Sequence, residues 1–414
     1  MSVTVTRRRL TLGLDEQIAD RYLRVPFPVE PGTESIEVRL AYDTTRGVVD
    51  LGCEGAAGWR GWSGGARSRY VIRADAATPG YLPGKPEPGE WHVVLGLHRL
   101  PADGLEVLLE ISVPATGGVE QEAQAPVQDR PRGSARGLPA PDGLEWVAGD
   151  FHAHTVHSDG ALSIDELAAT AVRSGLDFLA VTDHNTTSHH PHLPAVGARH
   201  DIALVPGQEV TTASGHANAL GDVGWIDFRA PTAAWQEGVR AAGGILSVNH
   251  AITADCSWLY PVPEGPHALE LWHSSSLREP AATSAWAFWG RWDTSAVPVG
   301  GSDFHAPGAA VPGAPTTWVA VEDRTPEAVV DAVRAGRTAI SLGAAGPGRD
   351  GVLTAPVLLR LDGDLLAVDA DGAVLVDVQG RRRRVIGDRV RVPGSWGEGK
   401  VRLEDADRRL LALC

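Results

Sequence analysis

The first 115 residues alternate apolar and polar positions over short segments. Residues 34–40 alternate in this way, and residues 92–97 and 105–111 are further apolar segments of strand length. Turns rich in glycine and proline, such as residues 79–89, separate them. A period of two residues is typical of strands with one buried face, and many short strands separated by turns favour a β-sandwich. The pattern therefore predicts an N-terminal β-sandwich-like domain over residues 1–115.

From Trp146 onward, short apolar segments alternate with segments of helical periodicity. Residues 116–145 before them are rich in Gly, Pro, Ala and Gln and predict a linker. Strands separated by helices predict a mainly parallel α/β sheet that closes, fully or partly, into a barrel over residues 146–345. Strands and turns then return, so residues 346–414 predict a small C-terminal β module. The predicted strands of the barrel are residues 146–151, 178–182, 202–205, 245–248, 268–272, 296–299 and 316–321, and its helices are residues 164–174, 232–242 and 326–335.

The composition is that of an ordinary globular protein of about two or three domains. The chain has 414 residues, of which 43% are hydrophobic and 21% charged. It contains no apolar run of about 18 residues, the length that a membrane-spanning helix needs. The basic residues 7–9 precede a short apolar stretch that Asp15 and Glu16 interrupt, so an export signal is not expected. We therefore predict a cytoplasmic protein without a membrane partner.

The charge distribution argues against a long nucleic acid as a partner. The net charge is −15, whereas nucleic-acid affinity depends on Lys and Arg that neutralise phosphates. The run Arg381–Arg384 could form a nucleic-acid patch, but in an acidic chain we interpret it as the solvated edge of a hairpin. A small phosphorylated substrate is compatible with this charge because bound metal ions supply local positive charge. The three cysteines are far apart in sequence and support neither a disulfide framework nor a thiolate zinc site.

Histidine is the residue type with the most uneven distribution. Two histidines lie before residue 100, and all the others fall between His152 and His305. In an extended segment, residues i and i+2 face the same side, so the imidazoles of His152 and His154 can bind one metal ion. Asp159 follows on a turn at Gly160, close enough to join them. The alternative is a pair of hydrogen-bonded histidines in a loop, which is the commoner case for an isolated His-x-His.

Similar polar motifs follow later in the chain, most of them just after a predicted strand. In a parallel α/β barrel, the carboxyl ends of all strands face one rim, where active sites form. We therefore expect these segments, which are far apart in sequence, to meet in space. The motifs are Asp183-His184-Asn185, Gly207-Gln208-Glu209, Gly215-His216-Ala217-Asn218, Asn249-His250 and Ser302-Asp303-Phe304-His305.

Taken in order, these motifs resemble the PHP (polymerase and histidinol phosphatase) domain family. The resemblance rests on His-x-His, Ser-Asp-Gly, Thr-Asp-His, Gly-x-Glu, a mid-chain His and a final Ser-Asp-x-His, and it covers residues 146–345. The N-terminal β domain and residues 182–187 are also similar to the CehA/McbA-like metallohydrolases. The resemblance implies a distorted (β/α)7 barrel that holds two or three divalent metal ions.

The resemblance also implies which residues bind these ions. Glu209 would bridge two of them, and His216 is the least secure ligand because Asn218 could take its place. His157 would line the pocket and Asp183 would orient a ligand, so these two are the candidate catalytic residues; the alternative for Asp183 is a cap at the end of its strand. The implied ligands are His152, His154, Glu209 and Asp303 for the first ion, Glu209, His216 and His250 for the second, and Asp159, His184 and His305 for the third.

The predicted donor set consists of imidazoles and carboxylates without a thiolate, which suits Mn²⁺, Fe²⁺ or Zn²⁺. Metal ions that share a carboxylate lower the pKa of a bound water and stabilise charge on a phosphoryl or carbonyl oxygen. No Gly-x-Ser-x-Gly turn indicates a serine nucleophile. We therefore predict a metal-dependent hydrolase.

Two substrate classes are compatible with such a centre, and a metal-binding scaffold is the non-catalytic alternative. The first class is a phosphoester: a monoester, a short nucleotide or the end of an oligonucleotide, as in exonuclease-like relatives. The second is a carbamate, ester or amide, as the CehA/McbA resemblance implies. We favour a small phosphoester substrate. Trp286 and Trp289, three apart on a predicted helix, are expected to pack in the core or between domains; if they line the pocket instead, they favour an aromatic substrate.

Overall fold

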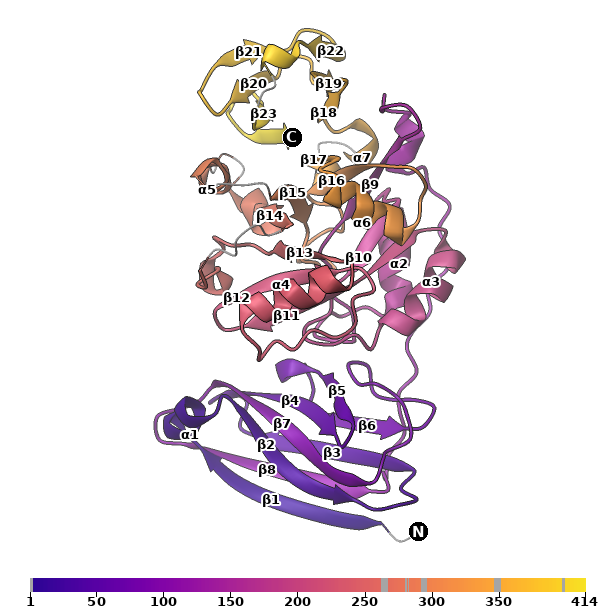
Figure 1. Ribbon diagram of the computed structural model, residues 1–414, viewed down its shortest axis with the longest axis vertical. Helices are drawn as coiled ribbons and strands as arrows, with labels where there is room; N and C mark the ends of the chain where they lie inside the picture. Colours follow the sequence, from indigo (N-terminus) through magenta and orange to yellow (C-terminus); the bar gives the residue numbers. More distant parts are fainter. Residues whose placement is uncertain are drawn as a thin grey trace. The chain divides into compact units, whose positions relative to one another are not determined.

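The computed structural model describes most of the chain, which divides into two compact units (Figure 1). Unit 1 contains the N-terminal region together with two loops from the middle of the chain, and unit 2 contains the rest. The described residues are 3–261, 267–279, 281, 283–291, 296–345, 351–396 and 399–414. Unit 1 consists of Met1–Ala123, Thr155–Ser163 and Asp183–Pro191, and unit 2 consists of Gln124–His154, Ile164–Thr182 and His192–Cys414.

The N-terminal region of unit 1 forms two antiparallel four-stranded sheets, with strand orders β1–β8–β3–β6 and β2–β7–β4–β5. Buried side chains of both sheets form one hydrophobic core, which includes Ile36, Leu51 and Trp91. Strands β3, β7 and β8 coincide with the predicted segments 34–40, 92–97 and 105–111, because a period of two places every second side chain in this core. The elements are β1 (Thr4–Leu12), α1 (Leu14–Ala19), β2 (Tyr22–Val29), β3 (Ser35–Tyr42), β4 (Val48–Gly55), β5 (Gly58–Trp62), β6 (Arg69–Arg73), β7 (Gly89–Arg99) and β8 (Leu105–Val113).

Unit 2 contains a sheet of 13 strands in the order β15-β14-β13-β12-β11-β10-β9-β16-β17-β24-β23-β20-β21. Its core includes Phe151, Phe178 and Val299, together with Val329 of helix α6. The strands are β9 (Glu145–Asp150), β10 (Phe178–Val181), β11 (Ala203–Thr212), β12 (Gly215–Leu220), β13 (Ile245–Val248), β14 (Ala268–His273), β15 (Val297–Gly301), β16 (Thr316–Val321), β17 (Thr338–Ser341), β20 (Val374–Asp377), β21 (Arg382–Arg384), β23 (Val401–Glu404) and β24 (Leu410–Leu413). The helices are α2 (Ile164–Arg173), α3 (Leu193–His200), α4 (Thr232–Ala241), α5 (Ser284–Arg291), α6 (Pro326–Arg334) and α7 (Gly351–Thr354).

The large sheet is mixed, whereas the sequence predicts a mainly parallel one. Strands β9, β10 and β11 run parallel, as do β13, β14 and β15. Strand β12 is antiparallel to both of its neighbours, and β16 is antiparallel to β9. The chain reverses before β12 at Gly215, whose φ of +130° favours glycine. The segment Gly215–Leu220, which the sequence indicates only as a motif, is therefore a hairpin strand that carries His216.

The C-terminal strands continue the large sheet. Strand β24 pairs with β17, where Ile340 lies opposite Leu413, and β23, β20 and β21 follow beyond it. Strand β21 contains part of the arginine run predicted at a hairpin edge, and it lies at one end of the strand order, where Arg382 pairs with Glu404 (2.9 Å). A separate three-stranded sheet contains β18 (Val357–Leu361), β19 (Asp364–Val368) and β22 (Arg389–Val392).

The structure can be compared with two predictions from the sequence, one about membrane-spanning helices and one about the cysteines. Among the described residues, no helix has the length and apolar character needed to cross a membrane. Cys53, Cys256 and Cys414 are all free thiols, as their distant positions in the sequence predict.

Candidate metal centre

Two short polar motifs lie side by side just after β9 and β15. Ala153 and Phe304 form a parallel β-bridge, and the backbone N–H of His154 donates to the Phe304 carbonyl (2.9 Å). His154 Nε2 lies 3.0 Å from Asp303 Oδ1, and the rings of His154 and His305 stack with centroids 4.2 Å apart. The His-x-His and Asp-x-His pairs of the sequence therefore meet in space.

Glu209, in β11, lies at the centre of the cluster. Its side chain is fully buried, and Oε1 lies 3.2 Å from His152 Nε2 and 3.2 Å from His250 Nε2. The same oxygen lies 3.1 Å from His216 Nδ1 and accepts a hydrogen bond from Asn249 Nδ2 (3.0 Å). One buried carboxylate thus contacts histidines from three separate segments of the chain.

Strand β12 offers two candidate ligands, His216 and Asn218, which are two residues apart. His216 Nδ1 lies 3.1 Å from Glu209 Oε1. Asn218 Nδ2 donates to the backbone carbonyl of Phe151 (3.0 Å), and its buried Oδ1 has no hydrogen-bond partner among the described residues. His216 as the ligand from β12 therefore stays a prediction.

Three groups of side chains in unit 2 offer ligand atoms within 4.8 Å of one another. The groups overlap, as neighbouring metal sites that share a carboxylate do. They are His152–His154–Glu209, His152–His250–Asp303 and Glu209–His216–His250. All ligands predicted for the first two ions therefore lie together, and their division between two ions stays a prediction.

The buried ring of His152 fits a metal-binding role. Its Nδ1 lies 3.0 Å from Glu270 Oε1 and donates to that carboxylate. Nε2, on the other side of the ring, lies 3.2 Å from oxygens of both Glu209 and Asp303. Two buried carboxylates beside one imidazole nitrogen are unfavourable unless positive charge lies between them. The residues present therefore fit a divalent ion.

The electrostatics of the cluster favour a bound positive charge. Burial alone would lower the pKa of His152, but the carboxylates of Asp303 and Glu209 raise it well above its usual value. Burial alone would raise the pKa of Asp303, but His152 and His154 hold it well below its usual value. In both cases positive charge beside the carboxylates is favourable, and either a proton or a metal ion can supply it.

Two residues of the cluster, both on β14, were not predicted from the sequence. Glu270 accepts hydrogen bonds from His152 Nδ1 (3.0 Å) and from the backbone N–H of His250 (2.8 Å). His273 Nε2 lies 3.2 Å from Asp303 Oδ2. A single charged residue inside an apolar strand was the signal that could have identified Glu270, because such a charge needs a buried partner.

Asp150, at the end of β9, organises the backbone around the cluster. It is fully buried and accepts hydrogen bonds from the backbone N–H groups of His152 (3.0 Å), Ser302 (2.9 Å) and Gly313 (2.7 Å). Burial raises the pKa of its carboxyl to about 6. These bonds fix the two segments that carry His152 and Asp303.

Two of the predicted ligands adopt left-handed backbone conformations. The φ angles are +27° at His250 and +51° at Asp303. Residues other than glycine rarely occupy this region, and when they do they are often at functional sites. The hydrogen bond from the His250 N–H to Glu270 holds the first of these conformations in place.

The Gly301→Ala variant is expected to weaken metal binding. A Cβ at this position would overlap with Glu270 Oε1 and lie 2.5 Å from His152 Cβ. We expect the Mn²⁺ affinity, measured by titration calorimetry, to fall by about 10- to 100-fold, the range typical of lost support for a ligand. The matched control is Gly238→Ala in α4, where the new Cβ meets only Ile226 Cδ1 at 3.3 Å. Equal affinities in the two variants would contradict this prediction.

Asp183 is fully buried in unit 1, and its hydrogen bonds go to a neighbouring loop. Oδ1 accepts from the Thr155 N–H (2.8 Å) and from Ser158 Oγ (2.6 Å), and Oδ2 accepts from Thr155 Oγ1 (2.7 Å). These contacts fix the loop, and the predicted role of Asp183 in orienting a ligand stays a prediction. His157 lies in the same loop and is also buried.

The three residues predicted to hold a third ion are divided between the units. In unit 1, His184 Nε2 lies 3.5 Å from Asp159 Oδ1. In unit 2, His305 Nδ1 lies 2.9 Å from the backbone carbonyl of Asp303. Their joint binding of a third ion stays a prediction.

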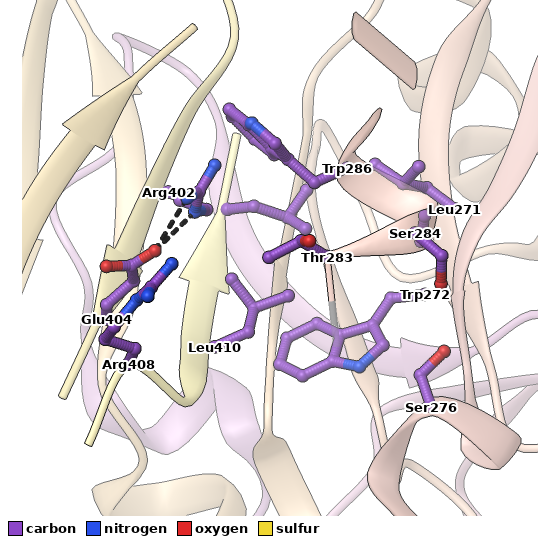
Figure 2. A pocket seen from close by; sticks show the side chains of 12 residues that line it. Leu271, Trp272, Ser276, Thr283, Ser284, Trp286, Arg402, Glu404, Arg408 and Leu410 are labelled. Carbon is purple, nitrogen blue, oxygen red and sulfur yellow. Dashed lines mark hydrogen bonds and ion pairs between the residues drawn. The ribbon is translucent and has the colours of Figure 1, made fainter. Parts of the chain in front are cut away.

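Trp286 and Trp289 pack against the C-terminal strands of unit 2. The Arg402 guanidinium lies 4.4 Å from the Trp286 ring centroid, and Lys400 Nζ lies 4.8 Å from that of the buried Trp289. Figure 2 shows the pocket that Trp286 lines together with Trp272 and Arg402. Its lining contains no predicted metal ligand. The contacts therefore favour packing between segments as the role of these two indoles.

Comparison with protein families matches residues 150–254 to the PHP domain. The 5'-3' exoribonuclease Rnm of Salmonella typhimurium is 40% identical over 65 residues, which are 15% of this chain and 22% of that protein. The DNA polymerase/3'-5' exonuclease PolX of Bacillus subtilis is 44% identical over 42 residues, 10% of this chain and 7% of that protein. The matched segments thus span less than a quarter of either curated relative. The chain contains a PHP domain, and the matched range includes His152, His154, Glu209 and His250.

Two solved structures share a more distant likeness. A two-domain protein from Bacteroides vulgatus, described as containing a PHP-like metal-dependent phosphoesterase, has a TM-score of 0.40 and 17% identity, covering 71% of this chain and 98% of that chain. An amidohydrolase from Chromobacterium violaceum has a TM-score of 0.29 and 18% identity, covering 39% of this chain and 89% of that chain. The resemblance to CehA/McbA-like metallohydrolases stays a prediction.

Proposed function

We propose that the protein is a metal-dependent hydrolase that cleaves a phosphoester. The observation that carries the proposal is the buried cluster around Glu209, in which two carboxylates lie within 3.2 Å of His152 Nε2. Buried carboxylates and histidines on several strands are costly to assemble unless they bind an ion. A purely structural role would be met more simply by apolar residues.

The ligands would divide as the sequence resemblance implies. His152, His154, Glu209 and Asp303 would hold one ion, and Glu209 would share a second with His216 and His250. When bound, such ions lower the pKa of water and stabilise negative charge on a phosphoryl oxygen. Glu270 keeps the His152 ring oriented, with Nδ1–H toward its own carboxylate and Nε2 toward Glu209 and Asp303.

We also propose that the large sheet of unit 2 is the distorted barrel of the PHP fold. Strand β15 lies at one end of the strand order. Its Gly300 N–H nevertheless donates to Thr317 Oγ1 of β16 (2.7 Å), a strand in the middle of that order. Contact between these strands supports a sheet that curves back on itself.

The PHP domain match supports a phosphoester substrate. The two curated relatives carry the names exoribonuclease and DNA polymerase/exonuclease, and exonucleases cleave phosphodiester bonds. The acidic chain argues against long nucleic acids, so a phosphomonoester or a short nucleotide is the substrate we favour.

Specific observations favour a carbamate or ester as the second candidate. Within the described residues, every ion pair of Asp303 and Glu270 is with a histidine, whereas phosphate sites commonly contain Arg or Lys. Ile252 and Leu259, on the loop that follows His250, are 40% and 72% exposed. Exposed apolar side chains on a loop that follows a predicted ligand would suit an apolar leaving group.

A substrate screen separates the two candidates. Protein loaded with Mn²⁺ is assayed with p-nitrophenyl phosphate, bis-p-nitrophenyl phosphate, p-nitrophenyl acetate and an aryl carbamate. We expect turnover of a phosphate ester above that of the acetate and the carbamate. Hydrolysis of the carbamate or acetate alone would replace the phosphoester proposal, and hydrolysis of none by metal-loaded protein would favour a metal-binding scaffold.

A further inference from the structure

A turn of the N-terminal β domain contacts a loop that carries predicted metal ligands, and both belong to unit 1. The Gly80 N–H donates to Ser188 Oγ (3.0 Å), and Thr186 Oγ1 donates to the Gly80 carbonyl (2.8 Å). Ser188 and Thr186 are buried in the segment Asp183–Pro191. Both polar groups of the Gly80 backbone are thus bound to the segment that begins with Asp183 and His184.

His157 connects the same turn to the second loop. Ser188 Oγ, which accepts from the Gly80 N–H, lies 2.7 Å from His157 Nδ1. On the other side of the ring, His157 Nε2 lies 3.0 Å from Glu122 Oε1. Arg67 also donates to the Val156 carbonyl. With both ring nitrogens bonded in a buried position, His157 is suited to holding the loop in place.

Asp183 joins the two loops to each other. Its carboxylate accepts three hydrogen bonds from Thr155 and Ser158. The residues that follow these contacts are Asp159 on one loop and His184 on the other, and their side chains lie 3.5 Å apart. The position of this pair therefore depends on both loops.

We propose that the β domain positions Asp159 and His184 through the turn at Gly80. His157, Thr186 and Ser188 are then positioning residues, which order the two loops before any ion binds. The inference rests on the proposed metal-dependent function, since it concerns how two predicted ligands are held. It gives the N-terminal β domain a role in ordering two predicted metal ligands of unit 1.

Gly80 has no room for a side chain at this contact. Its φ is +99°, a conformation that other residues rarely adopt. A Cβ would lie 2.7 Å from the Trp62 carbonyl oxygen and 2.8 Å from the His157 carbonyl oxygen, and both are backbone atoms. The Gly80→Ala substitution must therefore displace the loop or the turn. Gly118→Ala is the matched control, because its Cβ would meet nothing within 4 Å.

Amide hydrogen exchange of the full-length, metal-free protein tests the proposal directly. We expect Gly80→Ala to raise exchange by about fivefold or more in residues 155–163 and 183–191, and Gly118→Ala to leave it unchanged. Thr186→Val, which removes the donor to Gly80 and also the acceptor of the Ser188 N–H (3.2 Å), should act in the same direction, and Thr186→Ser should restore protection. Exchange in β3 and β7 reports whether the β domain itself is intact.

Metal content supplies the second measurement. We expect Gly80→Ala and Thr186→Val to lose affinity for one ion by about 10- to 100-fold and to retain the ions of the Glu209 cluster. Unchanged exchange in both loops, with β3 and β7 intact, would overturn the proposal even if the enzyme is active. If the unaltered protein binds no metal, the proposed function fails, while the exchange data still decide whether the Gly80 turn orders the loops.

Discussion

Glu209→Gln is expected to reduce hydrolysis by at least about 100-fold and to lower the number of bound ions. The carboxylate oxygen Oε1 lies within 3.2 Å of nitrogen atoms of His152, His216 and His250. Loss of a residue that supports a metal ligand commonly lowers metal affinity or activity by about 10- to 100-fold. Loss of a shared ligand should therefore lower activity by at least the upper value. Steady-state kinetics and metal analysis of the purified variant measure both effects.

The control for this variant is Glu237→Gln, an exposed carboxylate on α4 that pairs, among the described residues, with Arg240 on the same helix. It should keep both activity and metal content. A thermal melt of each variant shows whether the fold is intact. Glu209→Gln with full activity and full metal content would remove Glu209 from the centre.

Glu270→Gln is expected to lower metal affinity by about 10- to 100-fold without removing a ligand. Each carboxylate oxygen of Glu270 accepts one N–H, from His152 Nδ1 and from the His250 backbone. The new glutamine amide has one oxygen, which can accept, and one NH₂ group, which can only donate. Either the His152 Nδ1–H or the His250 N–H would then face the NH₂ group and lose its hydrogen bond. Calorimetric titration with Mn²⁺ measures the change in affinity.

Glu404→Gln is the matched control because Glu404 is also a buried carboxylate with two partners, here Arg382 and Arg402. It should reduce stability but leave metal affinity unchanged. If Glu270→Gln bound Mn²⁺ as tightly as Glu404→Gln does, the proposed orientation of the His152 ring would be wrong.

The sequence predicts local structure well where one period dominates. Alternation over residues 34–40 corresponds to β3, and the apolar segments 245–248 and 316–321 correspond to β13 and β16. Strand direction is less visible, because a hairpin such as β11–β12 depends on a single glycine with positive φ. The pairing of β17 with β24 joins residues about 70 apart in sequence, and no local pattern indicates it.

In the candidate site, too, the residues with a regular sequence spacing were predicted and those without one were not. His152, His154 and Asp303 were predicted because two i, i+2 pairs stand at strand ends, and the structure places them together. Glu270 and His273 have no comparable spacing, so only the packing of β14 against the cluster identifies them. Contacts of this kind depend on tertiary structure, which periodicity does not encode.

We propose that the cluster around Glu209 is a metal centre at which the substrate is hydrolysed. The most direct test is elemental analysis of the purified full-length protein, combined with the phosphatase assay before and after chelation. We predict at least two divalent ions per chain, with activity that is lost on chelation and restored by Mn²⁺. Fewer than one ion per chain, together with no hydrolysis after Mn²⁺ loading, would show that the cluster around Glu209 is not a hydrolytic metal centre.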